Sequence, residues 1–276
     1  MKIGALFNLN ESTNIRHEFE KVREQDLQTC QVCVWNPALY TEQNAKAIKE
    51  ASQETGVTVS TLWAGWSGPS VWNFHDGPLT LGLVPVAYRA HRLKELMAAS
   101  DFALQLGVVN IATHVGFLPE NPNDADYIGV IAALRSLVQH FKSRGQYFLF
   151  ETGQETPTTL VRAIEDIGTD NVGINFDTAN LILYGKAASL DAVELFGKYV
   201  RDVHCKDGLF PTGGHYLGQE VPLGQGKANI EAVVKHLLSI GYKGSLTIER
   251  EISGEEQIRD IIAARNLLRR IIDEVD

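Results

Sequence analysis

The sequence predicts a single α/β domain, a closed (β/α)8 barrel that takes in residues 1–276. Strand-like and helix-like segments alternate along the whole chain, eight of each, and the strands are almost continuously apolar. Such strands are typical of a parallel sheet covered by helices, and barrels of this kind have about 250 residues. The alternative is an open doubly wound sheet, which normally carries a glycine-rich phosphate turn after its first strand. The corresponding segment, Phe7-Asn8-Leu9-Asn10, contains no glycine, so we favour the closed barrel.

The first half of the chain contains four predicted strands and three predicted helices. The second strand ends at Asn36-Pro37, because a proline cannot donate to a sheet ladder. Gly56 and Gly107 follow two of the helices, and glycine suits the left-handed residue that commonly closes a helix. In chain order the segments are strand 3–9, helix 15–25, strand 30–35, helix 41–55, strand 57–62, helix 87–106 and strand 108–113.

The second half continues the alternation with five helices and four strands. Asn229 stands where an N-cap side chain would begin the helix that follows the seventh strand. In chain order the segments are helix 125–143, strand 147–151, helix 157–167, strand 171–177, helix 190–196, strand 200–206, helix 230–240, strand 245–249 and helix 254–275.

One connection, residues 63–85, is too long for a simple turn. It is rich in glycine and proline and holds Trp63, Trp66, Trp72 and Phe74. Loops of this length inside a compact domain are usually lids or binding loops. We therefore expect a lid over a ligand site. The alternative is a loop that its own aromatic side chains pack over the barrel mouth, and both can hold.

Composition narrows the class of partner. The formal charge of −9 argues against a nucleic-acid partner, because phosphate binding depends on a basic surface. No uncharged apolar stretch approaches the ~20 residues that cross a bilayer, and the first residues carry no signal-peptide pattern. The three cysteines (Cys30, Cys33 and Cys205) are too few for a disulfide framework, so we expect them buried and reduced. These features predict a cytoplasmic protein without a membrane partner and leave open whether it forms a homo-oligomer.

The last four predicted strands all end in residues that can bind a metal ion: Glu151, Asp177, His204 and Glu249. Functional groups of such barrels lie at the carboxyl ends of the strands, and neighbouring strands are ~4.8 Å apart. Taken singly, each acidic residue could be a helix N-cap or a solvated loop charge. Taken together, three carboxylates would repel one another unless a cation lay between them. One imidazole among three carboxylates suits Mn²⁺, Mg²⁺, Co²⁺ or Zn²⁺. We therefore predict a metal site.

Four short runs surround these residues: Phe150-Glu151-Thr152, Asn175-Phe176-Asp177-Thr178, Val203-His204-Cys205-Lys206-Asp207-Gly208 and Thr247-Ile248-Glu249. They resemble the sugar phosphate isomerase/epimerase group of the xylose-isomerase-like TIM barrel superfamily. That superfamily includes ketose 3-epimerases, hydroxypyruvate isomerase and endonuclease-IV-type repair enzymes. The resemblance covers essentially the whole chain and is specific for the superfamily and its metal site, not for a substrate.

The resemblance implies roles for the four residues. Glu151 and Glu249 match two glutamates that bind the metal and act as an acid/base pair, and Asp177 and His204 match the remaining ligands. A metal that chelates a carbonyl and a neighbouring hydroxyl acidifies the C–H between them. One glutamate then removes that proton and the other returns it to the opposite face or to the adjacent carbon. The expected substrate is a small sugar or sugar-like ketose or aldose.

Asn180 departs from the family pattern. Epimerases and repair enzymes of the superfamily commonly place a histidine three residues after the aspartate of strand six. An amide can hydrogen-bond a substrate hydroxyl, but it is a poor zinc ligand. Repair enzymes also use an Asp-x-His pair beyond strand seven, and the sequence has none there. With the negative charge, this argues against a repair nuclease.

Further candidate contacts lie near the same rim. His114 ends strand four and either contacts substrate or is a structural histidine. Lys206 either reaches a substrate oxygen and nearby carboxylates or is a salt-bridged lysine. Glu155 could orient Glu151, and Asn180 could hydrogen-bond substrate. Trp35 and Asn8, at early strand ends, could line the pocket. Gly224-Gln225-Gly226-Lys227 looks like part of a phosphate loop but lacks its spacing and preceding strand, so we expect a turn and leave phosphate binding open.

The leading hypothesis is therefore a divalent-metal-dependent sugar isomerase or epimerase. A lyase similar to inosose dehydratase could use the same metal site to expel a hydroxyl instead of returning a proton. A barrel that binds a sugar without catalysis is the third possibility. The mass of the product separates the first two, since isomerisation conserves mass and dehydration loses water.

Overall fold

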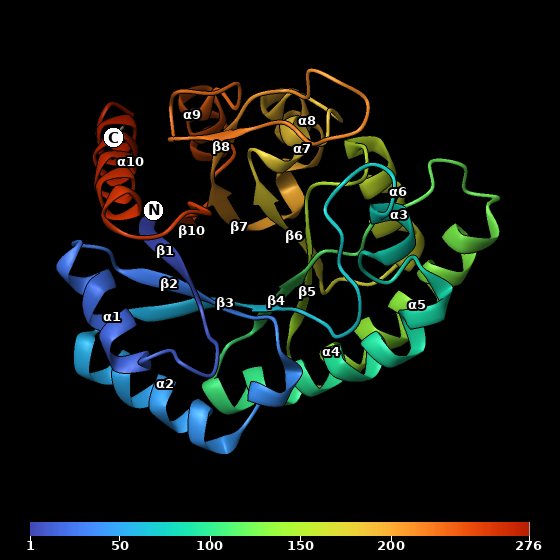
Figure 1. Ribbon diagram of the computed structural model, residues 1–276, viewed down its shortest axis with the longest axis horizontal. Coiled ribbons are helices and arrows are strands. Elements are labelled where there is room, and N and C mark those ends of the chain that lie inside the picture. The colour runs from blue at the N-terminus through green and yellow to red at the C-terminus, as the bar shows by residue number, and fades with distance from the viewer. Residues whose placement is uncertain (276) are drawn as a thin grey trace.

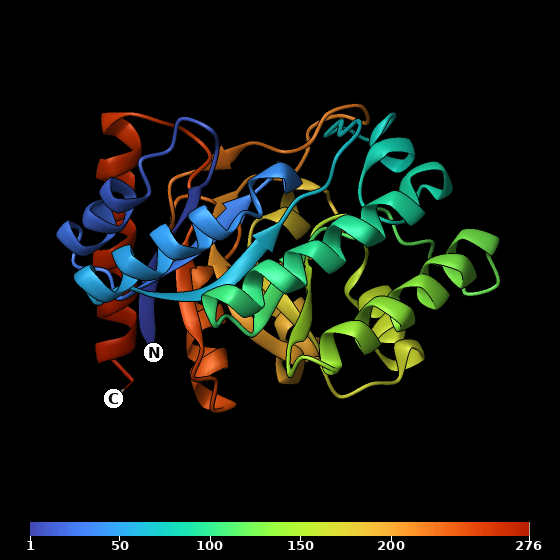
Figure 2. The same ribbon diagram turned by 90° about the horizontal axis from the view of Figure 1, so that it is seen from below.

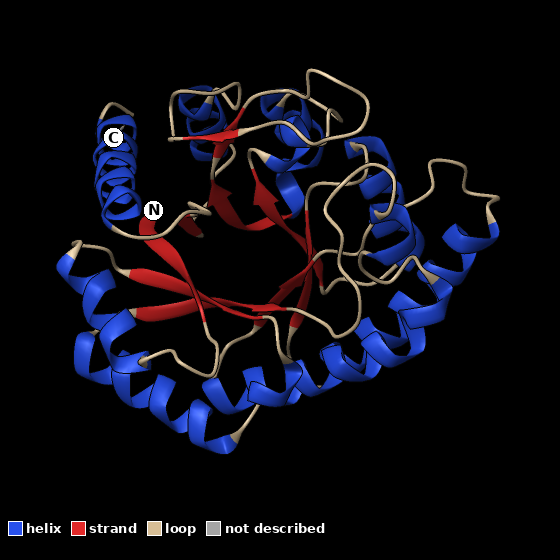
Figure 3. Ribbon diagram, in the orientation of Figure 1, coloured by secondary structure: helices blue, strands red, loops and turns tan. Residues whose placement is uncertain are grey.

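The computed structural model describes residues 1–275 and is a closed barrel of eight parallel strands (Figure 1). The last barrel strand, β10, pairs with β1 and closes the ring, with Lys2 opposite Ser245. Helices enclose the ring of strands on the outside (Figure 3). The predicted single α/β domain with a (β/α)8 barrel is confirmed, and the open sheet is excluded. Around the ring the strands are β1 (Lys2–Asn8), β2 (Thr29–Val34), β3 (Thr58–Ala64), β4 (Asn110–Thr113), β5 (Tyr147–Glu151), β6 (Val172–Asp177), β7 (Val200–Cys205) and β10 (Ser245–Ile248).

A helix of at least eight residues follows each barrel strand, as the alternating pattern predicts. The two chain ends lie on the same side of the barrel, close to β1 and the last helix (Figure 2). Within residues 1–275, no helix is both long and apolar enough to cross a membrane. The eight helices are α1 (Ile15–Glu24), α2 (Glu42–Thr55), α4 (Val86–Leu106), α5 (Ala125–Lys142), α6 (Pro157–Ile167), α8 (Ser189–Phe196), α9 (Ile230–Ser239) and α10 (Glu255–Asp273).

Several short elements have no counterpart in the sequence prediction. They comprise one or two turns of helix or a two-residue strand pair, which are too short to give a hydrophobic period. The strand pair is antiparallel and lies in the connection after β7. These elements are α3 (Gly77–Thr80), α7 (Asn180–Leu183), η1 (Pro37–Leu39), η2 (Gly197–Tyr199), β8 (Asp207–Gly208) and β9 (Glu220–Val221).

Two of the three predicted helix caps agree with the structure. Gly56 and Gly107 follow α2 and α4 with φ of 75° each, the left-handed conformation expected of closing glycines. Asn229 does precede α9, but the prediction of a side-chain cap was wrong. Its backbone is left-handed (φ 50°, ψ 49°), and its side chain accepts no hydrogen bond from the helix. An N-cap residue normally has extended backbone, which aims its side chain at the first free amides.

The main apolar core lies between the strands and the helices, and a separate small cluster fills the barrel itself. That inner cluster consists of Cys33, Trp63, Ala112 and Leu149. All three cysteines are free and buried, as expected. The barrel interior is also polar, because fully buried polar side chains lie just below the carboxyl ends of the strands: Gln31, Thr61, Asn175 and Thr247. This polar layer supports the site above it.

Arg92 of α4 ties down the long connection between β3 and α4. Its side chain is fully buried. The guanidinium donates to the backbone oxygens of Ser67 (3.1 Å), Pro69 (2.9 Å), Thr80 (2.7 Å) and Gly82 (2.6 Å). It also lies 4.1 Å from the centre of the Trp66 ring. Because β3 extends to Ala64, Trp63 belongs to the strand and not to the loop. The loop is thus packed, and its role as a lid stays a prediction.

Candidate functional site

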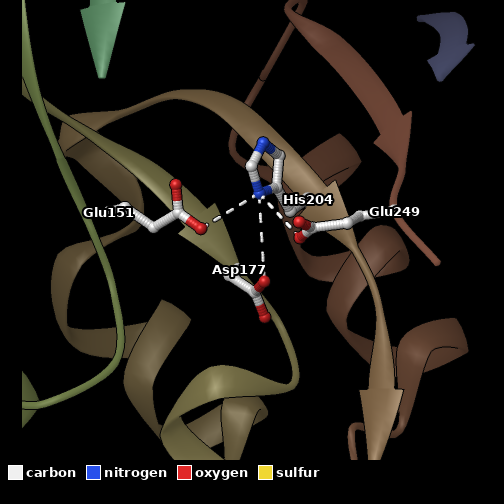
Figure 4. A group of neighbouring side chains, drawn as sticks. All are labelled: Glu151, Asp177, His204 and Glu249. Carbon is white, nitrogen blue, oxygen red and sulfur yellow. Dashed lines mark hydrogen bonds and ion pairs between the residues drawn. The ribbon is translucent and has the colours of Figure 1, made fainter. Parts of the chain in front are cut away.

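The four predicted metal ligands meet at the carboxyl end of the barrel (Figure 4). One donor atom of each residue lies within 4.8 Å of the others. His204 Nδ1 lies 3.0 Å from Glu249 Oε2, 3.2 Å from Glu151 Oε1 and 3.9 Å from Asp177 Oδ2. Asp177 is opposite His204 in the β6–β7 register, which sets both at the same level of the barrel. Four side chains that are far apart in the sequence therefore share one small volume, as the pattern of strand ends predicts.

A directional chain of hydrogen bonds fixes the orientation of the imidazole. His204 Nε2 donates to Gln31 Oε1 (2.8 Å), and Gln31 Nε2 donates to Asn175 Oδ1 (3.0 Å). Asn175 Nδ2 then donates to Glu151 Oε2 (3.2 Å), which also accepts from Trp63 Nε1. With Nε2 assigned as the donor to Gln31, Nδ1 is the ring nitrogen that faces the carboxylates and could bind a cation. Histidine ligands of metals are commonly held in this way, with the second ring nitrogen bound to a neighbouring acceptor.

The donor set fits a divalent cation. Asp177 Oδ2 and Glu249 Oε2 are buried and have no hydrogen-bond partner among the described residues. Buried carboxylate oxygens without a partner are costly, and a cation between them removes that cost. One imidazole nitrogen and three carboxylates are the ligands that Mn²⁺, Mg²⁺, Co²⁺ or Zn²⁺ accept. Glu151, Asp177, His204 and Glu249 could therefore hold one ion.

The pKa shifts of the cluster residues show that positive charge stabilises the cluster. Burial lowers the pKa of His204, but the facing carboxylates of Glu151 and Glu249 outweigh it and raise that pKa well above its usual value. Burial raises the pKa of Asp177 well above its usual range, against the opposing effect of Lys206. The cluster therefore retains protons unless another positive charge is present.

Lys206 supplies part of that charge from behind the cluster. Its Nζ lies 3.0 Å from Glu251 Oε1, 3.5 Å from Glu249 Oε2 and 3.8 Å from Asp177 Oδ2. The side chain is buried and does not line the neighbouring cavity. Of the two expectations for Lys206, the geometry favours the salt-bridged lysine over a direct substrate contact.

A cavity of about 910 Å³ opens over the cluster. Glu151 and Glu249 line it, whereas Asp177 and His204 lie behind them and do not. Figure 4 shows the two glutamates approaching from opposite sides of His204. A ligand in the cavity would therefore meet these two carboxylates before the other two residues.

Aromatic side chains form one wall of this cavity. Trp35 and Trp72 are each more than a third exposed, and their ring centres lie 5.9 Å apart, nearly perpendicular. Trp63 packs against Trp35 with ring centres 4.5 Å apart and ring planes tilted by 50°, and the ring centres of Trp72 and His114 lie 5.2 Å apart. Exposed indole faces suit the apolar C–H face of a sugar ring. Trp35 is thus a cavity residue, as predicted, and Trp72 belongs to the predicted lid loop.

The remaining predicted contacts divide into two groups. Asn180 and His114 line the cavity, with Asn180 Nδ2 3.5 Å and His114 Nε2 3.6 Å from Glu151 Oε1. Burial lowers the pKa of His114, which favours its neutral form. Glu155 is buried outside the cavity lining and makes no hydrogen bond to Glu151 within residues 1–275. The structure therefore shows no contact through which Glu155 would orient Glu151, and a contact of Glu155 with substrate stays a prediction.

The glycine-rich run after β9 is already occupied by a carboxylate. Asp207 accepts hydrogen bonds from the backbone amides of Gly224 (2.9 Å), Gly226 (3.0 Å) and Ala228 (2.9 Å). These are the amides that a phosphate would need. The run is a turn held by Asp207, as mainly expected, and offers no free phosphate loop.

Sequence reasoning missed the residues that orient the site. Gln31 lies in the middle of the buried strand β2, and Asn175 lies in the middle of the buried strand β6. A polar amide inside a continuous apolar run was the available signal, because a buried amide must find partners. Arg92 was missed for a different reason, since helix α4 gives no sign that one arginine turns inward.

Comparison with known proteins agrees with this geometry. Residues 19–271 match the family described as xylose isomerase-like TIM barrel. The chain belongs to this family. Among solved structures, this xylose isomerase-like barrel is similar to a xylose isomerase domain protein from Planctomyces limnophilus. The two are 34% identical with a TM-score of 0.91, and the match covers 100% of this chain and 99% of that one.

More distant matches show the fold alone. A D-tagatose 3-epimerase-like protein is 20% identical, with a TM-score of 0.76 and coverage of 100% and 98%. A barrel from Mycobacterium smegmatis in complex with magnesium is 16% identical (TM-score 0.72, coverage 99% and 97%). A probable 3-DHS dehydratase from Bacillus anthracis is 13% identical (TM-score 0.71, coverage 98% and 99%).

One curated protein also matches over part of the chain. The uncharacterized protein MJ1311 from Methanocaldococcus jannaschii is 27% identical over 122 residues, which make up 44% of this chain. The match spans 38% of the length of that relative.

Proposed function

We propose that this xylose isomerase-like barrel is a divalent-metal-dependent sugar isomerase or epimerase. The observation that carries the proposal is the position of Glu151 and Glu249. They are the two cluster residues that line the cavity, and they face it from opposite sides of His204. Two opposed carboxylates are what a reaction needs when a proton leaves one face of a carbon and returns to the other face or to its neighbour. The epimerase name among the structural matches supports the choice of substrate class.

In this mechanism the chain's own residues bind, orient and move the proton. Glu151, Asp177, His204 and Glu249 would hold the cation, which when bound polarises a substrate carbonyl and stabilises developing negative charge. The hydrogen bonds from Trp63 and Asn175 fix Glu151 Oε2, so that Oε1 is directed toward His114, Asn180 and the cavity. Trp35 and Trp72 form the wall of the cavity on the substrate side and limit the access of water. One glutamate takes the proton, and the other returns it.

A lyase is the second candidate, and His114 is the observation that favours it. This imidazole lines the cavity beside Glu151, and its Nδ1 has no partner among the described residues. A group there could hand a proton to a departing hydroxyl, while a glutamate removes the proton from the adjacent carbon. Dehydration would then replace epimerisation at the same site.

The test is metal analysis followed by NMR of ketoses, aldoses and inososes in D₂O. We expect about one divalent ion per chain and solvent deuterium at a substrate carbon. Chelation should stop the exchange, and adding back metal should restore it. Product of unchanged mass supports the isomerase or epimerase, and loss of water supports the lyase. Protein that binds sugar but exchanges no deuterium with metal bound would be a non-catalytic barrel, and the proposal would be wrong.

A further inference from the structure

The cavity over the metal cluster is also lined by residues that lie outside the cluster and its aromatic wall. One end is lined by Glu151, Glu249 and the tryptophan wall. The cavity then continues between α1 and α10, which lie on either side of β1 (Figure 1). We call this second end the α1–α10 arm. Seven residues of the two helices line it: His17, Glu18, Lys21 and Val22 of α1, and Gln257, Ile258 and Ile261 of α10.

The size of the cavity exceeds what a single sugar ring fills. A volume of about 910 Å³ equals that of roughly thirty water molecules in the liquid. It is also near the top of the range of about 300–1,000 Å³ found for pockets that take drug-sized ligands. A pentose or hexose is smaller than such a ligand. If its reacting carbon lies between Glu151 and Glu249, the α1–α10 arm stays open to a further part of the substrate.

The charges along the cavity argue against a phosphate group in the arm. Lys21 Nζ is paired with Glu18 at 2.9 Å. Arg250, which also lines the cavity, is paired with Glu220 at 3.0 Å and Asp260 at 2.8 Å. Each of these cations already has an acidic partner. Glu18 and Glu251 add negative charge to the lining. A phosphate would meet no free strong cation there and would be repelled.

The chemistry of the arm suits a neutral, polar ring. Val22 and Ile261 give it a buried apolar side, and Ile258 is partly exposed. Gln25, directly after α1, and Asn8, at the end of β1, add amide side chains to the cavity lining. An apolar face combined with amides matches the C–H face and the hydroxyl edge of a second sugar.

We propose that the α1–α10 arm is a second sugar subsite, and that the preferred substrate is a neutral glycoside or disaccharide. The reacting ring lies between the glutamates and the tryptophan wall, and the second ring lies between α1 and α10. This inference rests on the proposed function for the identity of the reacting end. It assigns the substrate class, which the metal cluster alone does not.

The experiment measures binding of neutral disaccharides and of their component monosaccharides to the metal-loaded protein by calorimetry. At least one disaccharide should bind 10-fold or more tightly than either component. His17→Trp would fill the arm from α1 and should remove that advantage while leaving monosaccharide affinity within about threefold. Glu24→Trp, on the same helix but outside the cavity lining, should keep the advantage. Ser253→Trp fills the cavity from the β10–α10 connection and provides a second test if His17→Trp unfolds.

Two results would overturn the proposal. One is a panel in which no disaccharide exceeds its components. The other is an advantage that survives both filling variants in folded protein. Failure here is separable from failure of the proposed function. Deuterium exchange into monosaccharides without any disaccharide preference would support the proposed reaction and exclude the subsite. Disaccharide preference without exchange would support the subsite and contradict the proposed reaction.

Discussion

The two halves of the barrel rim carry different chemistry. β5, β6, β7 and β10 supply the three carboxylates and the imidazole, whereas β2, β3 and β4 supply tryptophans, an amide and His114. The charged half resembles a metal and proton-transfer site, and the aromatic half resembles a surface that recognises a ligand. The halves are joined by hydrogen bonds across the barrel, from Trp63 to Glu151 and between Gln31 and His204. The proposed reaction and the recognition of a ligand should therefore be separable by mutation, although the orientation of the charged half depends on the aromatic half.

The largest effect should follow a change in the charged half. Glu151→Gln or Glu249→Gln removes a proton acceptor at the cavity surface, so we expect deuterium exchange to fall by about 10³-fold. Metal content must be measured on each variant, because both glutamates are also expected ligands. Asp202→Asn is the matched control, since Asp202 is a buried barrel carboxylate that accepts from Thr61 and does not line the cavity. Full exchange in either glutamate variant would contradict its role.

A change in the hydrogen bonds that join the two halves should lower the affinity for the metal ion, although the changed residue is not an expected ligand. Gln31→Met removes the acceptor of His204 Nε2–H, and we expect metal affinity to fall by about 10–100-fold. Gln146→Met is the control, because Gln146 is a buried amide bonded to Ser100 and lies away from the cluster. Titration with Mn²⁺ against a competing chelator measures both. Equal affinity in Gln31→Met and wild type would show that the amide does not orient the imidazole.

A change in the aromatic half should affect binding more than turnover. Trp72→Ala removes an exposed ring from the cavity wall, and we expect KM to rise by about 10-fold, equivalent to roughly 1.4 kcal/mol. kcat should change by less than about threefold, because Glu151 and Glu249 are unaltered. Tyr216→Ala removes another exposed aromatic ring outside the cavity lining and should change neither constant. A large fall in kcat alone would contradict the division between the halves.

Substitution of Glu155 should have the smallest effect on activity. We expect it to change the stability of the protein measurably. Burial raises the pKa of this carboxyl from 4.5 to about 7. The folded protein therefore holds the proton more tightly than the unfolded chain, and the free energy of unfolding falls as pH rises from 4.5 to about 7. Glu155→Gln should remove that fall, on the order of 3 kcal/mol. Urea unfolding at pH 5 and pH 8 measures it. Exposed Glu165→Gln should keep the wild-type slope.

The fold and the ligand cluster could be predicted because both follow from local patterns. Apolar runs alternating with helices define the barrel, and a barrel brings the last residue of each strand to one rim. Glu151, Asp177 and His204 occupy such ends or lie one residue away, and Glu249 directly follows β10. No knowledge of long-range packing was needed for these positions.

The supporting contacts could not be predicted because they join segments that no local pattern relates. Gln31 and Asn175 are 144 residues apart, and their pairing depends on which side chains point inward across the closed ring. The α1–α10 arm depends on how far two helices stand apart on either side of β1. The cap expected at Asn229 failed because its backbone adopts a left-handed conformation that the residue type permits but does not require.

Arg92 has a consequence for how molecules enter and leave. Because its guanidinium holds the backbone at Ser67, Pro69, Thr80 and Gly82, the two stems of the long connection are fastened to α4. Any motion of the predicted lid would be confined to the segment between these fastened points, which carries Trp72. If that segment opens to admit a ligand, a substitution at Arg92 should loosen it without altering Glu151 or Glu249.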